Sequence, residues 1–211
     1  MELLVAATMM SVLFVGLGTH LRGGLTVWQR ATSSGEALQQ ERVAFDRLER
    51  DLANAIVFDD QEDAYGDGRG RLPWPQFGDS ELAFFTISAA RRRQPPTVQF
   101  VTYDCEELDG TPGLWRTSLS VGAARTRSPA TEMERLLPDC EDLSFHYAYL
   151  PGDEGARQEI QWKPAWPDDL EKRLRLPRLV NVSLQAAGRE TRHLCAVPAG
   201  VFGAAEEAPS R

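Results

Sequence analysis

Two hydrophobic patterns follow one another in the first quarter of the chain. Residues 3–19 are almost purely apolar, and no Asp, Glu, Lys or Arg stands between Glu2 and Arg22. Apolar residues then recur at steps of three and four as far as Ile56, which predicts an amphipathic helix. Because this region contains no proline, both stretches can form one nearly continuous helix. Over residues 2–56 it would be about 80 Å long, so we expect its first half to protrude.

The second half of the predicted helix has an apolar face and a charged face. The positions that recur on the apolar face are Leu38, Glu41, Phe45, Leu48, Leu52, Ala55 and Ile56. On the other face, opposite charges stand four residues apart, Asp46 with Arg50 and Arg47 with Asp51, where they can pair. The Gly23-Gly24 pair could loosen or kink the helix between its halves. We therefore expect only the second half to pack along a folded domain.

The remainder of the chain alternates with a period of two. Residues 58–80 are rich in Asp, Gly and Pro and predict a loop. Alternating segments follow and predict strands at 81–88, 97–103, 113–119, 143–150, 158–163, 178–186 and 190–197. Short strands joined by Gly- and Pro-containing turns favour antiparallel sheets.

These patterns together predict an α+β fold, in which one long N-terminal helix packs on antiparallel sheets. We expect four segments. They are an apolar half-helix at 1–24, an amphipathic half-helix at 25–57, a β-rich head at 58–199 and a flexible tail at 200–211.

Composition narrows the class of protein. The chain has 211 residues, 42% of them hydrophobic and 26% charged, and these ordinary globular values exclude a polytopic membrane protein or a disordered polymer. The net charge is −8, and it belongs to the chain beyond the apolar stretch. An acidic chain is a poor candidate for nucleic-acid binding, because contacts with phosphates need clustered cations.

The apolar stretch at residues 3–19 has four possible interpretations. It approaches the roughly 20 residues that a membrane-spanning helix needs. A cleaved signal peptide would carry basic residues before its apolar part, whereas Glu2 stands there. The other two interpretations are a buried core helix and an oligomerisation stem that lies first in a bilayer and later in a helix bundle. By the positive-inside rule, Arg22 and Arg30 would lie in the cytoplasm and the N-terminus outside.

Chemistry-bearing motifs are missing from the sequence. His20, His146 and His193 lie in no nucleophile or metal-ligand motif, and no phosphate-binding glycine loop occurs. We predict no catalytic residue, no cofactor, no small-molecule substrate and no enzymatic activity. A cluster of acidic residues offers oxygen ligands that calcium could use, namely Asp59, Asp60, Glu62, Asp63 and Asp67. The cluster does not follow the order of ligands in an EF-hand, so a solvated loop is the main interpretation.

An acid followed by a long apolar helix resembles the start of the type IV pilin-like proteins. In this chain the acid is Glu2. Several body motifs, in order, resemble the minor pseudopilin J family of type II secretion systems. They are Arg47–Leu52, Leu114-Trp115-Arg116, Leu136-Leu137 with Leu143–Tyr147, and Trp162 and Trp166 with Leu176–Val182. The order holds across nearly the whole chain.

The resemblance implies a pilin-like fold and a structural role. Family members lose a basic leader to a prepilin peptidase, and we expect that leader and the first mature residues to be encoded before Met1. Glu2 would pair with the N-terminal amine of a neighbouring subunit and set its register. The membrane or filament part of the helix would include Leu3, Leu4, Val5, Val12, Leu13, Phe14 and Val15.

By the same resemblance, the protein would sit in the bacterial inner membrane with a single span and its C-terminal domain in the periplasm. Minor pseudopilins of the I and K types would be its partners, and together they would initiate and cap the pseudopilus. A minor pilin of a type IV pilus or DNA-uptake system is the alternative, because its stem would look the same. A membrane-anchored or secreted periplasmic enzyme or binding module is a third hypothesis.

The three cysteines, Cys105, Cys140 and Cys195, show no zinc-ligand spacing. All three could be small buried apolar residues, or one pair could form a disulfide and leave an odd thiol. Export, as the resemblance implies it, is the only reason to expect a disulfide between Cys105 and Cys140.

Overall fold

The computed structural model describes one long helix, one short helix and eleven strands. The described residues are 2–57, 73, 75–88, 96–126, 128–129, 132–151, 159–166 and 175–205. The chain divides into two compact units, Met1–Arg42 and Val43–Arg211.

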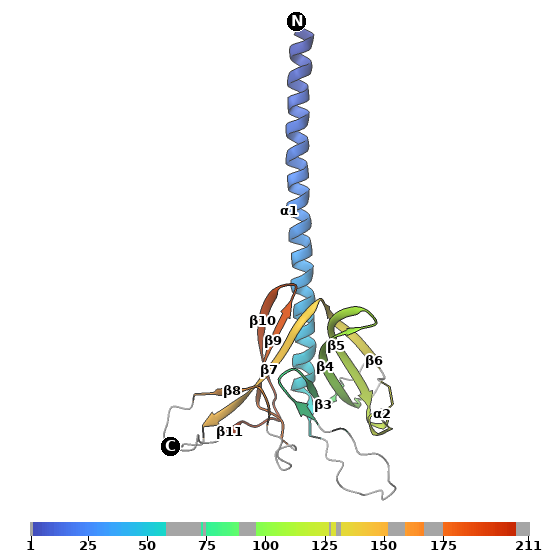
Figure 1. Cartoon of the computed structure of the whole chain (residues 1–211), viewed down its shortest axis with the longest axis vertical. Coiled ribbons are helices and arrows are strands. Elements are labelled where there is room, and N and C mark those ends of the chain that lie inside the picture. The colour runs from blue at the N-terminus through green and yellow to red at the C-terminus, as the bar shows by residue number, and fades with distance from the viewer. Residues whose placement is uncertain are drawn as a thin grey trace, which may run out of the picture. The chain divides into compact units, whose positions relative to one another are not determined.

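Helix α1 runs from Glu2 to Ala53 without a break (Figure 1), which confirms the prediction of one long helix. The Gly23-Gly24 pair does not interrupt it. Hydroxyl groups on both sides of this pair donate to carbonyls of the preceding turn, Thr19 Oγ1 to the Gly16 oxygen at 2.8 Å and Thr26 Oγ1 to the Arg22 oxygen at 2.9 Å. Such local bonds are compatible with helical backbone, and the helix continues through both sites.

The first unit exposes large apolar side chains. Those described include Met9, Met10, Phe14, Val15, Leu17, Leu21, Leu25, Val27 and Trp28. Contiguous exposed apolar surface of this kind typically marks a site of interaction with protein or membrane.

In the second unit, the end of α1 buries one face. Ala44, Phe45, Leu48 and Leu52 are buried at steps of one, three and four residues, as the amphipathic pattern predicts. Leu38 is exposed, so the apolar stripe as predicted begins too early in the sequence.

Six strands form the first sheet, called sheet A, in the order β1-β3-β4-β5-β6 with β2 paired to β3. All of its pairs are antiparallel. The strands are β1 (Ala55–Ile56), β2 (Gln76–Phe77), β3 (Leu82–Ile87), β4 (Val98–Leu108), β5 (Thr111–Ser120) and β6 (Glu132–Pro138). Helix α2 (Val121–Thr126) follows β5.

Five strands form the second sheet, called sheet B, in the order β10-β9-β7-β11 with β8 paired to β7. The strands are β7 (Cys140–Pro151), β8 (Gln161–Lys163), β9 (Leu179–Ala186), β10 (Arg189–Ala196) and β11 (Gly203–Ala205). Only β11 is parallel to its neighbour, while the other described pairs are antiparallel. The α+β pilin-like fold, with a long helix and antiparallel sheets, is thereby confirmed.

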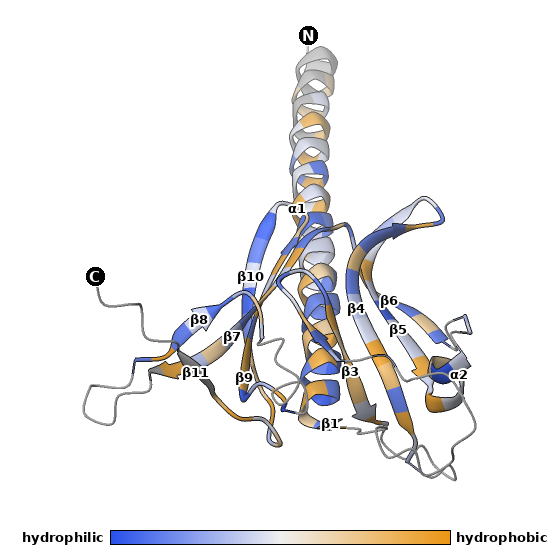
Figure 2. Ribbon diagram, turned by 60° about the horizontal axis from the view of Figure 1, so that its bottom comes forward, coloured by the Kyte–Doolittle hydropathy of each residue, from blue (hydrophilic) through white to orange (hydrophobic). Residues whose placement is uncertain are grey.

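Figure 2 shows the end of α1 between the strands of sheet A and those of sheet B. One hydrophobic core joins the three. Leu52 from α1, Phe84 and Tyr103 from sheet A, and Phe145 and Val182 from sheet B are all fully buried within it. A smaller cluster around Phe85 and Phe100 lies on the other side of sheet A, where Ala124 of α2 packs. Residues that alternate along β3 therefore belong to different clusters, as the two faces of a strand require.

Each predicted strand corresponds to a strand of the structure, although β4, β5 and β7 are longer than expected and β8 is shorter. Three short strands correct the prediction, because β1 lies where the helix was expected to continue, β2 in the predicted loop and β11 in the predicted tail. The turn residues explain how two of the hairpins close. Asp109-Gly110 and Ala187-Gly188 have positive φ at both positions, 51° and 74° in the first and 49° and 71° in the second. Such two-residue turns match the twist of antiparallel strands.

Candidate functional site

A buried charged network fixes the end of α1 to sheet A. The Arg116 guanidinium on β5 donates through Nε to Asp51 Oδ2 at 2.6 Å, and the Tyr103 hydroxyl on β4 donates to the same oxygen at 2.7 Å. Thr86 Oγ1 on β3 donates to the Asp51 main-chain oxygen at 2.9 Å. Three neighbouring strands thus bind one residue of the helix. The side chains of Arg116 and Asp51 are 1% and 8% exposed, so this ion pair is shielded from water.

Tyr103 and Arg116 both keep their protons in this network. Burial, and next the Asp51 charge, raise the pKa of Tyr103 well above its ordinary value, so the hydroxyl stays protonated and donates. Burial alone would lower the pKa of Arg116, but the hydrogen bond and charge of Asp51 outweigh it and raise that pKa overall. The guanidinium therefore stays charged.

The position of Asp51 corrects the sequence analysis. We expected Asp51 on a solvated helix face, paired with Arg47. It is buried instead, and the Arg47 Nε lies 4.0 Å from Asp51 Oδ2, farther than the Arg116 Nε. Two segments that carried the family resemblance, 47–52 and 114–116, meet at this ion pair.

A second set of contacts joins α1 to β10 in sheet B. The ring of His193 stacks on Phe45 with 5.0 Å between centroids, and its Nε2 lies 3.4 Å from Glu49 Oε2. Cys195, two residues farther along β10, is fully buried and is not in a disulfide. Burial, with a smaller contribution from Glu49, raises the pKa of the Cys195 thiol to about 12, which leaves it protonated and unreactive.

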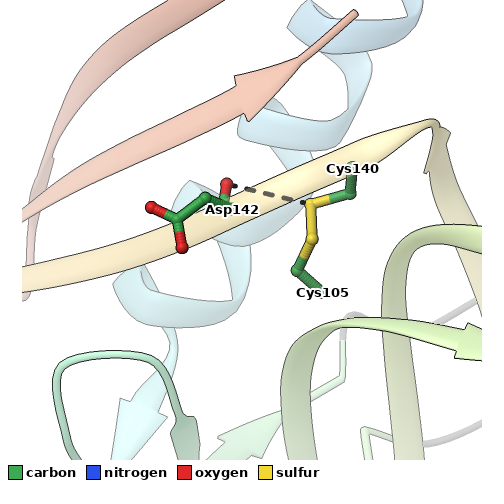
Figure 3. The surroundings of a disulfide bond; sticks show 3 residues. All are labelled: Cys105, Cys140 and Asp142. Carbon is green, nitrogen blue, oxygen red and sulfur yellow. Dashed lines mark hydrogen bonds between the residues drawn. A yellow bond between two sulfur atoms is a disulfide. The ribbon is translucent and has the colours of Figure 1, made fainter.

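A disulfide joins the two sheets (Figure 3). Cys105 on β4 is bonded to Cys140 at the start of β7, with 5.7 Å between their Cα atoms. The Cys140 Sγ lies 3.9 Å from the Asp142 main-chain oxygen. Sheet A, sheet B and the end of α1 are therefore linked pairwise, by the disulfide, the Asp51 network and the His193 contacts.

An unusual carboxyl group lies on the other face of β4. Asp104 is half-buried in register with Trp115 of β5. Burial, followed by the charges of Glu106 and Glu81, raises the pKa of Asp104 from 3.8 to about 6. The folded protein thus binds a proton here more tightly than the unfolded chain does.

Replacing Asp104 with Asn should raise stability near pH 7 and change it little near pH 4. The native contribution of Asp104 is full below about pH 4 and is lost as the pH rises through about 6, where the carboxyl must ionise. The gain should be no more than about 1 kcal/mol, because solvent screens a partly exposed group. Thermal unfolding from pH 4 to 8 measures it. Glu107→Gln, an exposed acid on the same strand, is the control, and equal pH profiles of both variants would contradict the prediction.

Most site residues predicted from the sequence fall where no side chain is described. Glu2, Leu3, Leu4, Val5, Val12 and Leu13 lie in α1, but their side chains are outside the described part. Phe14 and Val15 are described and exposed. The acids considered for calcium, Asp59, Asp60, Glu62, Asp63 and Asp67, lie outside the described residues altogether. Their roles stay predictions.

Two features are absent from the described residues. No helix segment among them is long and apolar enough to count as a membrane span. No three His, Cys, Asp or Glu side chains gather there in a way that could hold a metal ion. His20 is exposed on α1, and His146 is half-buried on β7. Neither belongs to the set of contacts that His193 makes with Phe45 and Glu49.

The described contacts hold the helix and the sheets together rather than present a reactive group to solvent. The class of protein is therefore inferred from comparison with known families. Residues 20–197 match the family model for protein J of the type II secretion system. A comparison with curated proteins finds none that matches. The matched range covers most of the chain, including the Asp51 network and the disulfide. The chain therefore belongs to the type II secretion system protein J family, whose members are structural pseudopilins.

Proposed function

We propose that this chain is a minor pseudopilin that assembles with the I- and K-type pseudopilins to initiate and cap the pseudopilus. The family match over residues 20–197 carries the proposal. The exposed apolar side chains of α1 support it, since they need a bilayer or other helices to cover them. The role is structural, and the chain supplies surfaces rather than catalysis.

Residues 1–24 would be the part of the chain that moves from the inner membrane into the filament, and residues 25–57, which hold the rest of α1 and strand β1, would support the head. The head at 58–199 would lie in the periplasm, and residues 200–211 would follow it and add strand β11 to sheet B. In this arrangement an oxidising compartment surrounds the Cys105–Cys140 disulfide, as such bonds require.

Glu2→Ala should impair assembly while the head stays folded. Within a filament core, a carboxylate that pairs with a neighbour's N-terminal amine sets register, because leaving either charge alone in low dielectric is costly. The measurement is secretion in a strain that carries the variant, together with copurification of the I- and K-type pseudopilins. Thermal unfolding of the variant controls for folding. Unchanged secretion and copurification would contradict the assembly role of Glu2.

Copurification from detergent-solubilised membranes tests the function itself. The full chain should bring down the I- and K-type pseudopilins of its own secretion system, and deletion of its gene should stop secretion. If neither partner binds and the deletion strain secretes normally, the proposed function is wrong.

A further inference from the structure

Strand β10 forms an edge of sheet B. It pairs with β9 along all eight of its residues, and among the residues that the structure describes no other strand pairs with it. Figure 1 shows β10 and β9 as neighbouring strands joined by a tight turn.

The turn between β9 and β10 decides which backbone groups point away from the sheet. Residues of a two-residue hairpin that flank the turn exchange both hydrogen bonds, and such pairs then alternate along the ladder. Here the flanking pair is Ala186 and Arg189. The N–H and C=O groups of Glu190, Arg192 and Leu194 therefore point to the open edge.

Natural edge strands are protected by proline, a bulge, a covering element or charged side chains, because their free backbone groups recruit other strands. Among the described residues, β10 has only the last of these, through the exposed charges of Glu190 and Arg192. The β9–β10 register has no shift, and β10 contains no proline. Leu194, at the end of the outward-facing row, is 55% exposed.

The side chains of β10 that alternate with Glu190, Arg192 and Leu194 pack against α1, which holds the strand in place. His193 stacks on Phe45, and Cys195 is fully buried. Strand β10 is therefore already ordered before a partner binds, so binding costs little conformational entropy in β10.

The side chains at the open edge define what fits there. Glu190 and Arg192 form an exposed ion pair, with 2.8 Å between Oε1 and Nε. A strand with a basic residue opposite Glu190 and an acidic residue opposite Arg192 would replace that pair by two cross-strand pairs. An apolar residue opposite Leu194 would cover its exposed side chain.

We propose that the open edge of β10 docks an extended segment of a partner pseudopilin, which adds a strand to sheet B. The segment carries basic, acidic and apolar side chains at alternate positions, opposite Glu190, Arg192 and Leu194. The backbone supplies affinity and the three side chains supply selectivity, as in other cases of strand addition. This inference rests on the proposed function.

The test uses Leu194→Pro and Leu194→Lys in the full chain. The Leu194 N–H points outward, so proline removes a donor to the partner without removing a bond to β9. Copurification with the I- and K-type pseudopilins should fall about tenfold or more for both variants. Met133→Lys is the matched control, because Met133 is 51% exposed on β6, an edge strand of sheet A, and this variant should bind as the wild type does.

Hydrogen exchange supplies a readout specific to strand addition. In the free chain the amides of Glu190, Arg192 and Leu194 should exchange quickly, and in the complex they should be protected. If the wild type binds a partner while these amides still exchange quickly, or both Leu194 variants bind normally, this inference is wrong and the proposed function stands. If the wild type binds neither partner, both fall.

Discussion

Replacing Arg116 with Met should lower the free energy of unfolding by about 3–5 kcal/mol, the cost of leaving a buried charge without its partner. Asp51 would lose its 2.6 Å bond to the guanidinium while remaining 8% exposed beside Tyr103. Its carboxylate would then have to stay charged in a dry site or take up a proton. Denaturant unfolding at pH 7 measures the loss.

The matched control is Arg192→Met. Arg192 also donates through Nε to a carboxylate, that of Glu190, but both side chains are more than half exposed. Such surface pairs contribute about 0–1 kcal/mol, so this variant should unfold almost as the wild type does. The double variant Asp51→Leu with Arg116→Met should recover much of the loss, because it removes both buried charges. A loss below about 1 kcal/mol for Arg116→Met would contradict the buried-pair argument.

Sequence alone gave no sign that Asp51 and Arg116 would pair. Arg47 stands four residues before Asp51, which is the ordinary spacing of a surface pair on a helix. In β5, Trp115 looks like the inward residue, whereas Leu114, Arg116 and Ser118 face the core and Trp115 is half-buried on the other side. Only the tertiary arrangement, with β4 and β5 beside the end of α1, reveals a partner that can offset the burial of each charge.

The secondary structure was easier to predict where one face of an element is buried. The end of α1 and strands such as β9 follow the periods of 3.6 and 2, because Leu48, Leu52, Val180 and Val182 face one core. Strand β6 was missed as a strand for the opposite reason. It lies at an edge of sheet A, its first four residues are exposed, and the burial that produces alternation is missing there.

The candidate site was predictable only in part. A pairing of Cys105 with Cys140 was expected from export alone, and nothing in the spacing indicated that it would join two sheets. The contacts of His193 with Phe45 and Glu49 depend on a strand and a helix that are far apart in sequence. Long-range contacts of this kind leave no local periodicity, so period-based reasoning does not find them.

Removal of the Cys105–Cys140 disulfide should lower the free energy of unfolding by about 4 kcal/mol. The bond closes a loop with a sequence separation of 35, and it restricts the unfolded chain more than the folded one. The double variant Cys105→Ala, Cys140→Ala tests this without leaving a thiol at either position. Denaturant unfolding of oxidised wild type, reduced wild type and the double variant measures the difference.

Three comparisons separate the disulfide from the simple loss of two side chains. Reductant should destabilise the wild type to about the level of the double variant, and it should leave the double variant unchanged. Cys195→Ala should keep the full response to reductant, because the Cys195 thiol is buried and is not disulfide-bonded. In the proposed pseudopilin this bond keeps sheet A, which holds Arg116, and sheet B, which holds the β10 edge, in one unit. Equal stability of the oxidised and reduced wild type would show that the core alone holds the two sheets together.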